Sequence, residues 1–328
     1  SSTEAWVQDM VSKPIAPPAE GSSGYAETDT SRIWYKKLPA YAVTETSKGS
    51  VVLIHGLGSS SNFWPPYVYE PLRRAGYDVI ISDHRGCGKS QSPINAQHSD
   101  YDLSDMVRDN MAIMDALRIK QAYVIGVSLG GMIGQHMAIE FPHRVKGLVS
   151  VMSTGDMNDP EFPASHDFKL ATLKLFVRYS LIPSEANTVR MMLGIHHLLK
   201  GQQPVDNPHI IRATLQELRY QHGFNHKLPE QQANAMRRSG SRLAALSQLT
   251  IPVLVVHGDA DPLIDIGQAK KYAAEIPQHE SLWIQGMGHD LAPSHVAQWL
   301  SKSLSFMDAL PYTPFKATIS LLSLPGLS

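Results

Sequence analysis

Short apolar runs separated by amphipathic stretches dominate the pattern of hydrophobic and polar positions along this chain. Most of the runs are rich in β-branched residues, which is typical of strands buried on both faces of a parallel sheet. Residues 103–117 and 129–140 carry apolar side chains at helical spacing, and residues 294–307 predict a closing helix. Together these elements predict an α/β fold with a mostly parallel, doubly wound sheet. Its predicted strands are residues 31–37, 50–55, 77–82, 124–127, 145–152, 251–257 and 281–285.

The alternation of strand and helix stops between residues 154 and 248. Only helical patterns occur there, at residues 168–179, 184–199, 208–220 and 230–246. The sequence therefore predicts a core of residues 31–153 and 249–308 with an inserted all-helical cap at 154–248. Residues 1–30 are rich in Pro, Ser, Gly and Glu and predict an irregular lead-in. The apolar tail, 309–328, is given no role by the pattern.

A G-x-S-x-G pattern joins the strand at 124–127 to the helix at 129–140, with Gly126 and Gly130 flanking Ser128. In a sharp strand-to-helix turn, a Cβ two residues either side of the serine would collide with the turn. Glycines there leave the serine hydroxyl exposed at the start of the helix. The helix N-terminus adds unpaired N–H groups and partial positive charge where an oxyanion would form. An ordinary glycine-rich turn would share these glycines, so the placement between strand and helix favours a nucleophilic serine.

A serine hydroxyl is a weak nucleophile and needs a base that is itself oriented by an acid. Two loops that follow predicted strands supply candidates, and open α/β sheets place their sites at this edge. One loop contains Asp259 and Asp261, and the other contains His289. Asp259 is an alternative acid that we expect to shape its turn, and Asp156, after another core strand, is a second alternative.

Other histidines and the cap methionines have simpler explanations. We expect His55 to brace the loop that follows it and His257 to satisfy a strand end. The pairs His196-His197 and His222-x-x-x-His226 lack the cysteine or H-E-x-x-H partners of a zinc site, which predicts solvated cap histidines. Methionines expected to fill the cap core or line a pocket are Met191, Met192 and Met236.

Composition narrows the class of protein further. The chain has 328 residues, 43% apolar and 18% charged, which favours a globular protein with an ample core. A net charge of −1 without a long basic stripe disfavours nucleic acid and anionic membranes as partners. No apolar run approaches the ~20 residues that span a bilayer. The single cysteine, Cys87, excludes an internal disulfide framework, and we expect a cytoplasmic protein. Because the chain begins at Ser1, removal of a signal peptide stays an alternative to this expectation. The oligomeric state, monomer or homodimer, also stays open.

Four blocks together resemble the α/β-hydrolase-fold serine hydrolases. They are His55-Gly-Leu-Gly58, the glycine-rich loop 83–90, the elbow 126–131, and the paired Asp261 and His289 loops. The likeness covers residues 31–307. The order nucleophile, acid, base is the order of this fold, unlike those of chymotrypsin and subtilisin. Within the superfamily the chain resembles the capped carboxylesterase branch, with a weaker likeness to aclacinomycin methylesterase-like enzymes at residues 151–156.

The resemblance implies a catalytic triad in which Ser128 is the nucleophile, His289 the base and Asp261 the orienting acid. It also implies an oxyanion hole formed by the backbone N–H groups of Leu57 and Leu129. The implied activity is that of a serine carboxylesterase acting on small to medium carboxylic esters through an acyl-enzyme, without cofactor or metal.

Other activities of the same fold stay open because fold does not settle function. They are proline iminopeptidase, carbon–carbon hydrolase, acyltransferase and perhydrolase, together with a ligand-binding receptor of slow turnover. An aminopeptidase would need an acidic cap residue such as Glu185 or Glu217 to hold a substrate amine. Epoxide hydrolases and haloalkane dehalogenases place a carboxylate at the nucleophile position, so Ser128 disfavours both.

Overall fold

The computed structural model describes residues 2–19, 21–41, 47–90 and 100–311, and their core is one eight-stranded sheet. The strands run in the order β1-β2-β4-β3-β5-β6-β7-β8; only the pairs β1·β2 and β2·β4 are antiparallel. The predicted α/β-hydrolase fold is therefore confirmed. The strands are β1 (Ser22–Glu27), β2 (Arg32–Leu38), β3 (Ser50–Ile54), β4 (Asp78–Ser82), β5 (Ala122–Val127), β6 (Val145–Val151), β7 (Val253–Gly258) and β8 (His279–Ile284).

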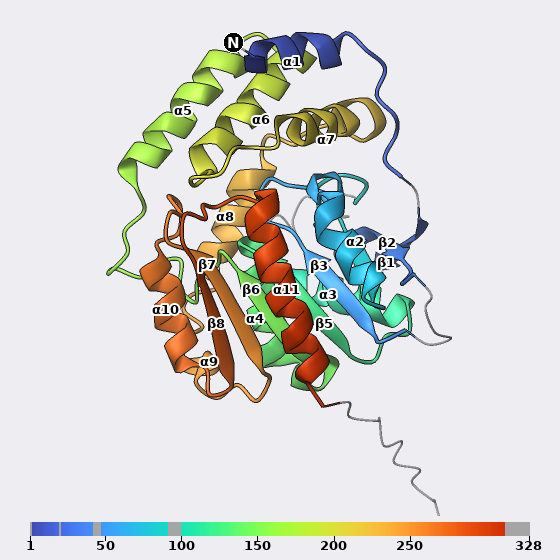
Figure 1. The fold of residues 1–328 in the computed structure, drawn as a ribbon, viewed down its shortest axis with the longest axis vertical. Coiled ribbons are helices and arrows are strands. Elements are labelled where there is room, and N and C mark those ends of the chain that lie inside the picture. The colour runs from blue at the N-terminus through green and yellow to red at the C-terminus, as the bar shows by residue number, and fades with distance from the viewer. Residues whose placement is uncertain (1, 20, 42–46, 91–99, 312–328) are drawn as a thin grey trace, which may run out of the picture.

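Helices cover both faces of this sheet (Figure 1). On one face α2 (Pro66–Arg74) packs against α11 (Pro293–Ala309), with Leu72 and Trp299 fully buried. The other face carries α3 (Leu103–Ala116), α4 (Leu129–Glu140) and α10 (Ile266–Glu275). Because β5 and β7 are buried along their whole length, their apolar sequences are explained by cover on both faces. The sequence pattern had not indicated α10.

A helical cap lies between β6 and β7, above the carboxyl ends of the parallel strands (Figure 1). It contains α5 (His166–Ser180), α6 (Glu185–Leu199), α7 (Asn207–Tyr220) and α8 (Leu228–Arg238), and a short helix, α9 (Leu243–Leu246), leads back to the core. The single helix expected over 230–246 is divided because Gly240 takes a φ of +66°, outside the right-handed helix. No helix in the described ranges has the length and apolar character needed to cross a bilayer.

The first thirty residues are more ordered than the irregular lead-in that their composition predicted. Residues Ser2–Val11 form α1, which packs on α6 and α7 with Val7 fully buried. Residues Ser22–Glu27 form β1, an antiparallel edge strand of the main sheet. Each segment buries only one side chain, so the apolar pattern gives little sign of either. Most of the tail expected at 309–328 lies outside the described residues, and α11 ends at Ala309.

Candidate active site

Ser128 lies in a strained turn between β5 and α4. Its backbone has a φ of 55° and a ψ of −116°, a conformation that non-glycine residues seldom adopt. A Cβ on Gly126 would lie 2.1 Å from the Gly130 carbonyl oxygen, and a Cβ on Gly130 would lie 1.9 Å from the Ile54 carbonyl oxygen. Only glycine fits at either position, as the G-x-S-x-G pattern predicted, and the serine hydroxyl therefore stands clear of the turn.

The loops after β7 and β8 bring an acid and a histidine to this serine. His289 Nε2 lies 2.9 Å from Ser128 Oγ, and its Nδ1 lies 2.8 Å from Asp261 Oδ2. Both distances fall within the range required between a nucleophile, its base and an orienting group. The alternative acids are engaged elsewhere: Asp259 accepts the Gly286 N–H at 2.7 Å, and Asp156 accepts the Asn158 N–H at 2.9 Å.

Asp261 is a buried carboxylate with a full set of donors. Its Oδ1 accepts the N–H groups of Leu263 and Ile264, each at 2.9 Å. Its Oδ2 lies 3.2 Å from Nε2 of His257, which sequence reasoning had treated only as a strand cap. Burial would raise the pKa of Asp261, but the charge of His289 and hydrogen bonds from both histidines hold the pKa below its usual range. The group therefore stays ionised and holds His289 with its Nδ1 protonated.

Leu57 and Leu129, the predicted oxyanion donors, lie on two segments next to Ser128. Leu129 is the first residue of α4, and Leu57 lies in the loop after β3. A Cβ on Gly56 would lie 3.5 Å from the Ser128 Cβ, so this loop passes directly beside Ser128. Positive-φ Gly58 then turns the chain away.

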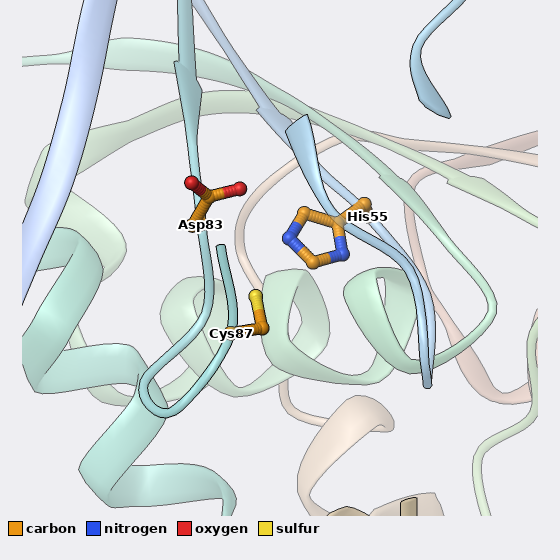
Figure 2. A group of neighbouring side chains, drawn as sticks. All are labelled: His55, Asp83 and Cys87. Atoms are coloured by element: carbon orange, nitrogen blue, oxygen red, sulfur yellow. The ribbon is translucent and has the colours of Figure 1, made fainter. Parts of the chain in front are cut away.

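His55, at the start of the same loop, has a bracing position. Its Nε2 accepts the His84 N–H at 3.3 Å, and its carbonyl oxygen accepts from His84 Nε2 at 2.7 Å. Burial lowers the pKa of His55 to about 4, so the ring is neutral. Figure 2 shows it beside Asp83 and Cys87. One possible metal-ligand atom from each of these three residues lies within 4.8 Å of the other two.

This buried trio is already occupied by hydrogen bonds within the chain. Asp83 accepts the N–H groups of Ser61 at 2.8 Å and Lys89 at 3.0 Å. Burial raises the pKa of the Cys87 thiol well above its usual value, which favours the protonated thiol. The trio therefore serves to join the loops after β3 and β4.

A cavity of about 690 Å³ opens over Ser128 and His289, between the core and the cap. Its wall is largely apolar. The three cap methionines predicted to line a pocket do so, with three more from the core side of the site: Met132, Met152, Met157, Met191, Met192 and Met236.

Sequence reasoning missed the polar residues of this wall. His196, expected to be solvated, lies in the wall and stacks on Phe63 with ring centroids 6.1 Å apart. Burial raises the pKa of Asp290 to about 6 and that of Glu217 to about 7. No sequence motif marks these positions. A polar residue on an amphipathic helix, such as His196 or Glu217, has the same pattern whether it faces water or a cavity, and Asp290 lies in the loop after β8.

Residues 49–295 match the profile of the alpha/beta hydrolase fold family, and the chain belongs to this family. Rhodomycin D methylesterase DauP of Streptomyces sp. (strain C5) is 27% identical over 270 residues, which cover 76% of this chain and 87% of DauP. RutD of Caulobacter sp. (strain K31), provisionally named a carbamate hydrolase, is 26% identical over 243 residues, 71% of this chain and 80% of RutD.

Among solved structures, the esterase RhEst1 from Rhodococcus sp. ECU1013 has a TM-score of 0.68 and 22% identity, covering 88% of this chain and 100% of that one. At this identity the structural likeness shows the fold alone. The family match and the relative DauP confirm the predicted resemblance to α/β hydrolases, with its likeness to methylesterases. The chain is thus supported as a hydrolase with esterase-like relatives.

Proposed function

We propose that this protein is a serine carboxylesterase that works through an acyl-enzyme on Ser128. The observation that carries the proposal is the continuous chain of contacts from Ser128 Oγ through both ring nitrogens of His289 to Asp261, at 2.9 and 2.8 Å. That chain opens into the cavity, where an ester can approach.

In the first half of the reaction, His289 Nε2 accepts the hydroxyl proton as Ser128 Oγ attacks the ester carbonyl carbon. The carbonyl oxygen becomes an oxyanion that the N–H groups of Leu57 and Leu129 stabilise, each by about 3 kcal/mol. His289 then gives its proton to the departing alkoxide, and the alcohol leaves. In the second half a water molecule, deprotonated by His289, attacks the acyl-enzyme. Ser128 recovers the proton as the carboxylic acid departs.

The cavity favours an apolar, bulky acyl group. Six methionines line it, its exposed wall is largely apolar, and its volume is in the range of drug-sized ligand pockets. The relative DauP is named as a methylesterase, which supports methyl esters of large acids as one substrate class. The aminopeptidase alternative has weaker support, because Glu185 is paired with Arg219 and Glu217 accepts hydrogen bonds from Ser60 and Asn62.

Hydrolysis of p-nitrophenyl esters from acetate to palmitate, alongside methyl esters of polycyclic acids, tests the proposal. The wild-type enzyme is expected to cleave them, and Ser128→Ala to lose the activity. A fluorophosphonate probe should label the wild-type protein at Ser128 and leave Ser128→Ala unlabelled. Activity that survives in Ser128→Ala would show that another residue is the nucleophile.

A further inference from the structure

Two side chains of the cap contact the loop that carries the Leu57 N–H. The loop leaves β3 at Ile54 and ends in the short 3-10 helix Ser61–Phe63. The cap helices α7 and α8 lie over the carboxyl ends of the parallel strands, where this loop begins (Figure 1). Gln232 extends from α8 and Glu217 from α7, and both are buried, with exposed fractions of 0% and 2%.

Gln232 binds the loop one residue beyond Leu57. Its Oε1 accepts the backbone N–H of Gly58 at 2.9 Å. Gly58 has a φ of +69°, so its peptide groups are turned out of regular structure and require a partner from elsewhere. The acceptor comes from a residue 174 positions away in the sequence, on the cap helix α8. A buried amide oxygen in this place fixes the direction of the backbone next to Leu57.

Glu217 binds the same loop two residues further on. Its Oε1 accepts the Ser60 hydroxyl and, at 2.8 Å, the Asn62 side-chain N–H. Ser60 Oγ in turn accepts the Asn62 backbone N–H at 3.3 Å and so caps the 3-10 helix. One carboxylate therefore holds both ends of the turn that follows Gly58.

We infer that Glu217 and Gln232 are positioning residues through which the seated cap holds the oxyanion loop and aims the Leu57 N–H at the reacting carbonyl. The inference rests on the proposed esterase function. Neither side chain needs to touch the substrate. If the cap lifts, Gly58, Ser60 and Asn62 lose their acceptors together, and the oxyanion hole loses one of its two donors. Ester cleavage is thus coupled to closure of the cap over the substrate.

Protonation of Glu217 gives this coupling a pH dependence. Burial and the nearby charge of Asp83 raise the pKa of Glu217 to about 7, against the opposing effects of the Ser60 and Asn62 hydrogen bonds and of Lys89. The Cys87 thiol, also close by, is neutral. An ionised carboxylate accepts hydrogen bonds more strongly than a neutral acid. The loop is therefore held most firmly above pH 7, and kcat is expected to fall as Glu217 is protonated.

Steady-state kinetics of variants at the two positions test the inference. Gln232→Leu removes the acceptor and is expected to lower kcat about tenfold with KM within about twofold, because the affected donor acts only once the oxyanion forms. Gln232→Glu keeps an oxygen acceptor and should recover most of the loss. Glu217→Gln should lower kcat about threefold at pH 8 and lose the ionisation near pH 7 from its kcat profile. The matched control is Glu185→Gln, a cap glutamate paired with Arg219 that should leave kcat and its profile unchanged.

Amide hydrogen exchange of residues 55–63 is measured on the same variants. Faster exchange in Gln232→Leu together with the loss of kcat supports the inference. Unchanged exchange would overturn it, and so would faster exchange with wild-type kcat. Exchange needs no turnover, so the two proposals fail separately. An inactive wild-type protein would sink the esterase proposal, and loop exchange would still decide whether the cap holds this loop.

Discussion

The two donors of the candidate oxyanion hole lie on segments that are fixed in different ways. The turn before Leu129 is set by close backbone approach: a Cβ on Gly126 would meet the Gly130 carbonyl oxygen of the same turn, and a Cβ on Gly130 would meet the Ile54 carbonyl oxygen of β3. The loop of Leu57 depends on hydrogen bonds that it donates to cap side chains far away in the sequence. One half of the hole is therefore built into the core, and the other half is completed only when cap and core meet.

The helices beside these segments differ in the same way. In α4 most side chains are buried, and a Cβ on Gly134 would lie 2.6 Å from Leu148 Cδ1. The outermost cap helix, α5, has no buried residue, and Leu173 is 56% exposed. A close-packed helix transmits any change in its side chains, whereas an exposed one tolerates change. The core thus positions Ser128, the proposed nucleophile, and the cap can vary with the substrate.

The largest expected effect comes from the acid of the triad. Asp261→Asn should lower kcat by about 10⁴-fold, because the amide no longer holds His289 with Nδ1 protonated. Asp156→Asn, in the loop after β6, is the matched control, and it should stay within about threefold of wild type. If Asp259→Asn proves the more damaging change, the acid has been assigned to the wrong residue of its loop.

A methyl group in the elbow should have the next largest effect. Gly130→Ala places a Cβ 1.9 Å from the Ile54 carbonyl oxygen, so the turn must shift. We expect kcat/KM to fall at least about 100-fold and the free energy of unfolding to fall by about 2 to 3 kcal/mol. Gly194→Ala, in which the Cβ meets only the flexible side chain of Leu175, should change stability by less than about 1 kcal/mol in the same urea titration.

A similar change where the cap meets the His289 loop should be milder. The His289 N–H donates to the Leu199 carbonyl oxygen at 2.8 Å, and a Cβ on Gly201 would lie 2.2 Å from the Gly286 carbonyl oxygen. Gly201→Ala should push the segment between α6 and α7 away from the His289 loop. We expect kcat to fall about tenfold, because a small misplacement of His289, the proposed base, is costly. A kcat equal to that of wild type would mean that this cap contact does not position His289.

The smallest effect is expected on the outside of the cap. Arg190 of α6 and Glu4 of α1 form an exposed ion pair, with 2.6 Å between Nη2 and Oε1. Glu4→Gln should lower the free energy of unfolding by no more than about 0.5 kcal/mol and leave kcat unchanged. A tenfold change in kcat would contradict the view that only the inner contacts of the cap bear on catalysis.

Sequence patterns predicted the core site well for a physical reason. Ser128 and Asp261 follow strands that are buried along their whole length, His289 follows the edge strand β8, and parallel strands bring such positions to one edge. The glycine positions of the turn, Gly126 and Gly130, also leave no room for a Cβ, which makes the pattern recognisable in the sequence. Glu217 and Gln232 could not be predicted, because their partners are backbone and side-chain groups more than 150 residues away. The full extent of α1 and β1 could not be predicted, because each buries a single side chain, Val7 and Ala26 respectively.

The ordered N-terminal segment changes how the cap is attached to the rest of the protein. An insertion between β6 and β7 alone would be joined to the core by two connecting segments, and such an arrangement permits a simple hinge. Here β1 is anchored in the sheet while α1 is anchored on the cap, and Arg219 Nη1 donates to the Lys13 carbonyl oxygen at 2.7 Å. This third tether limits how far α6 and α7 can move from the core, so the cap opens and closes by a small displacement rather than a wide swing. Helix α5, which has no buried residue, makes no part of this tether.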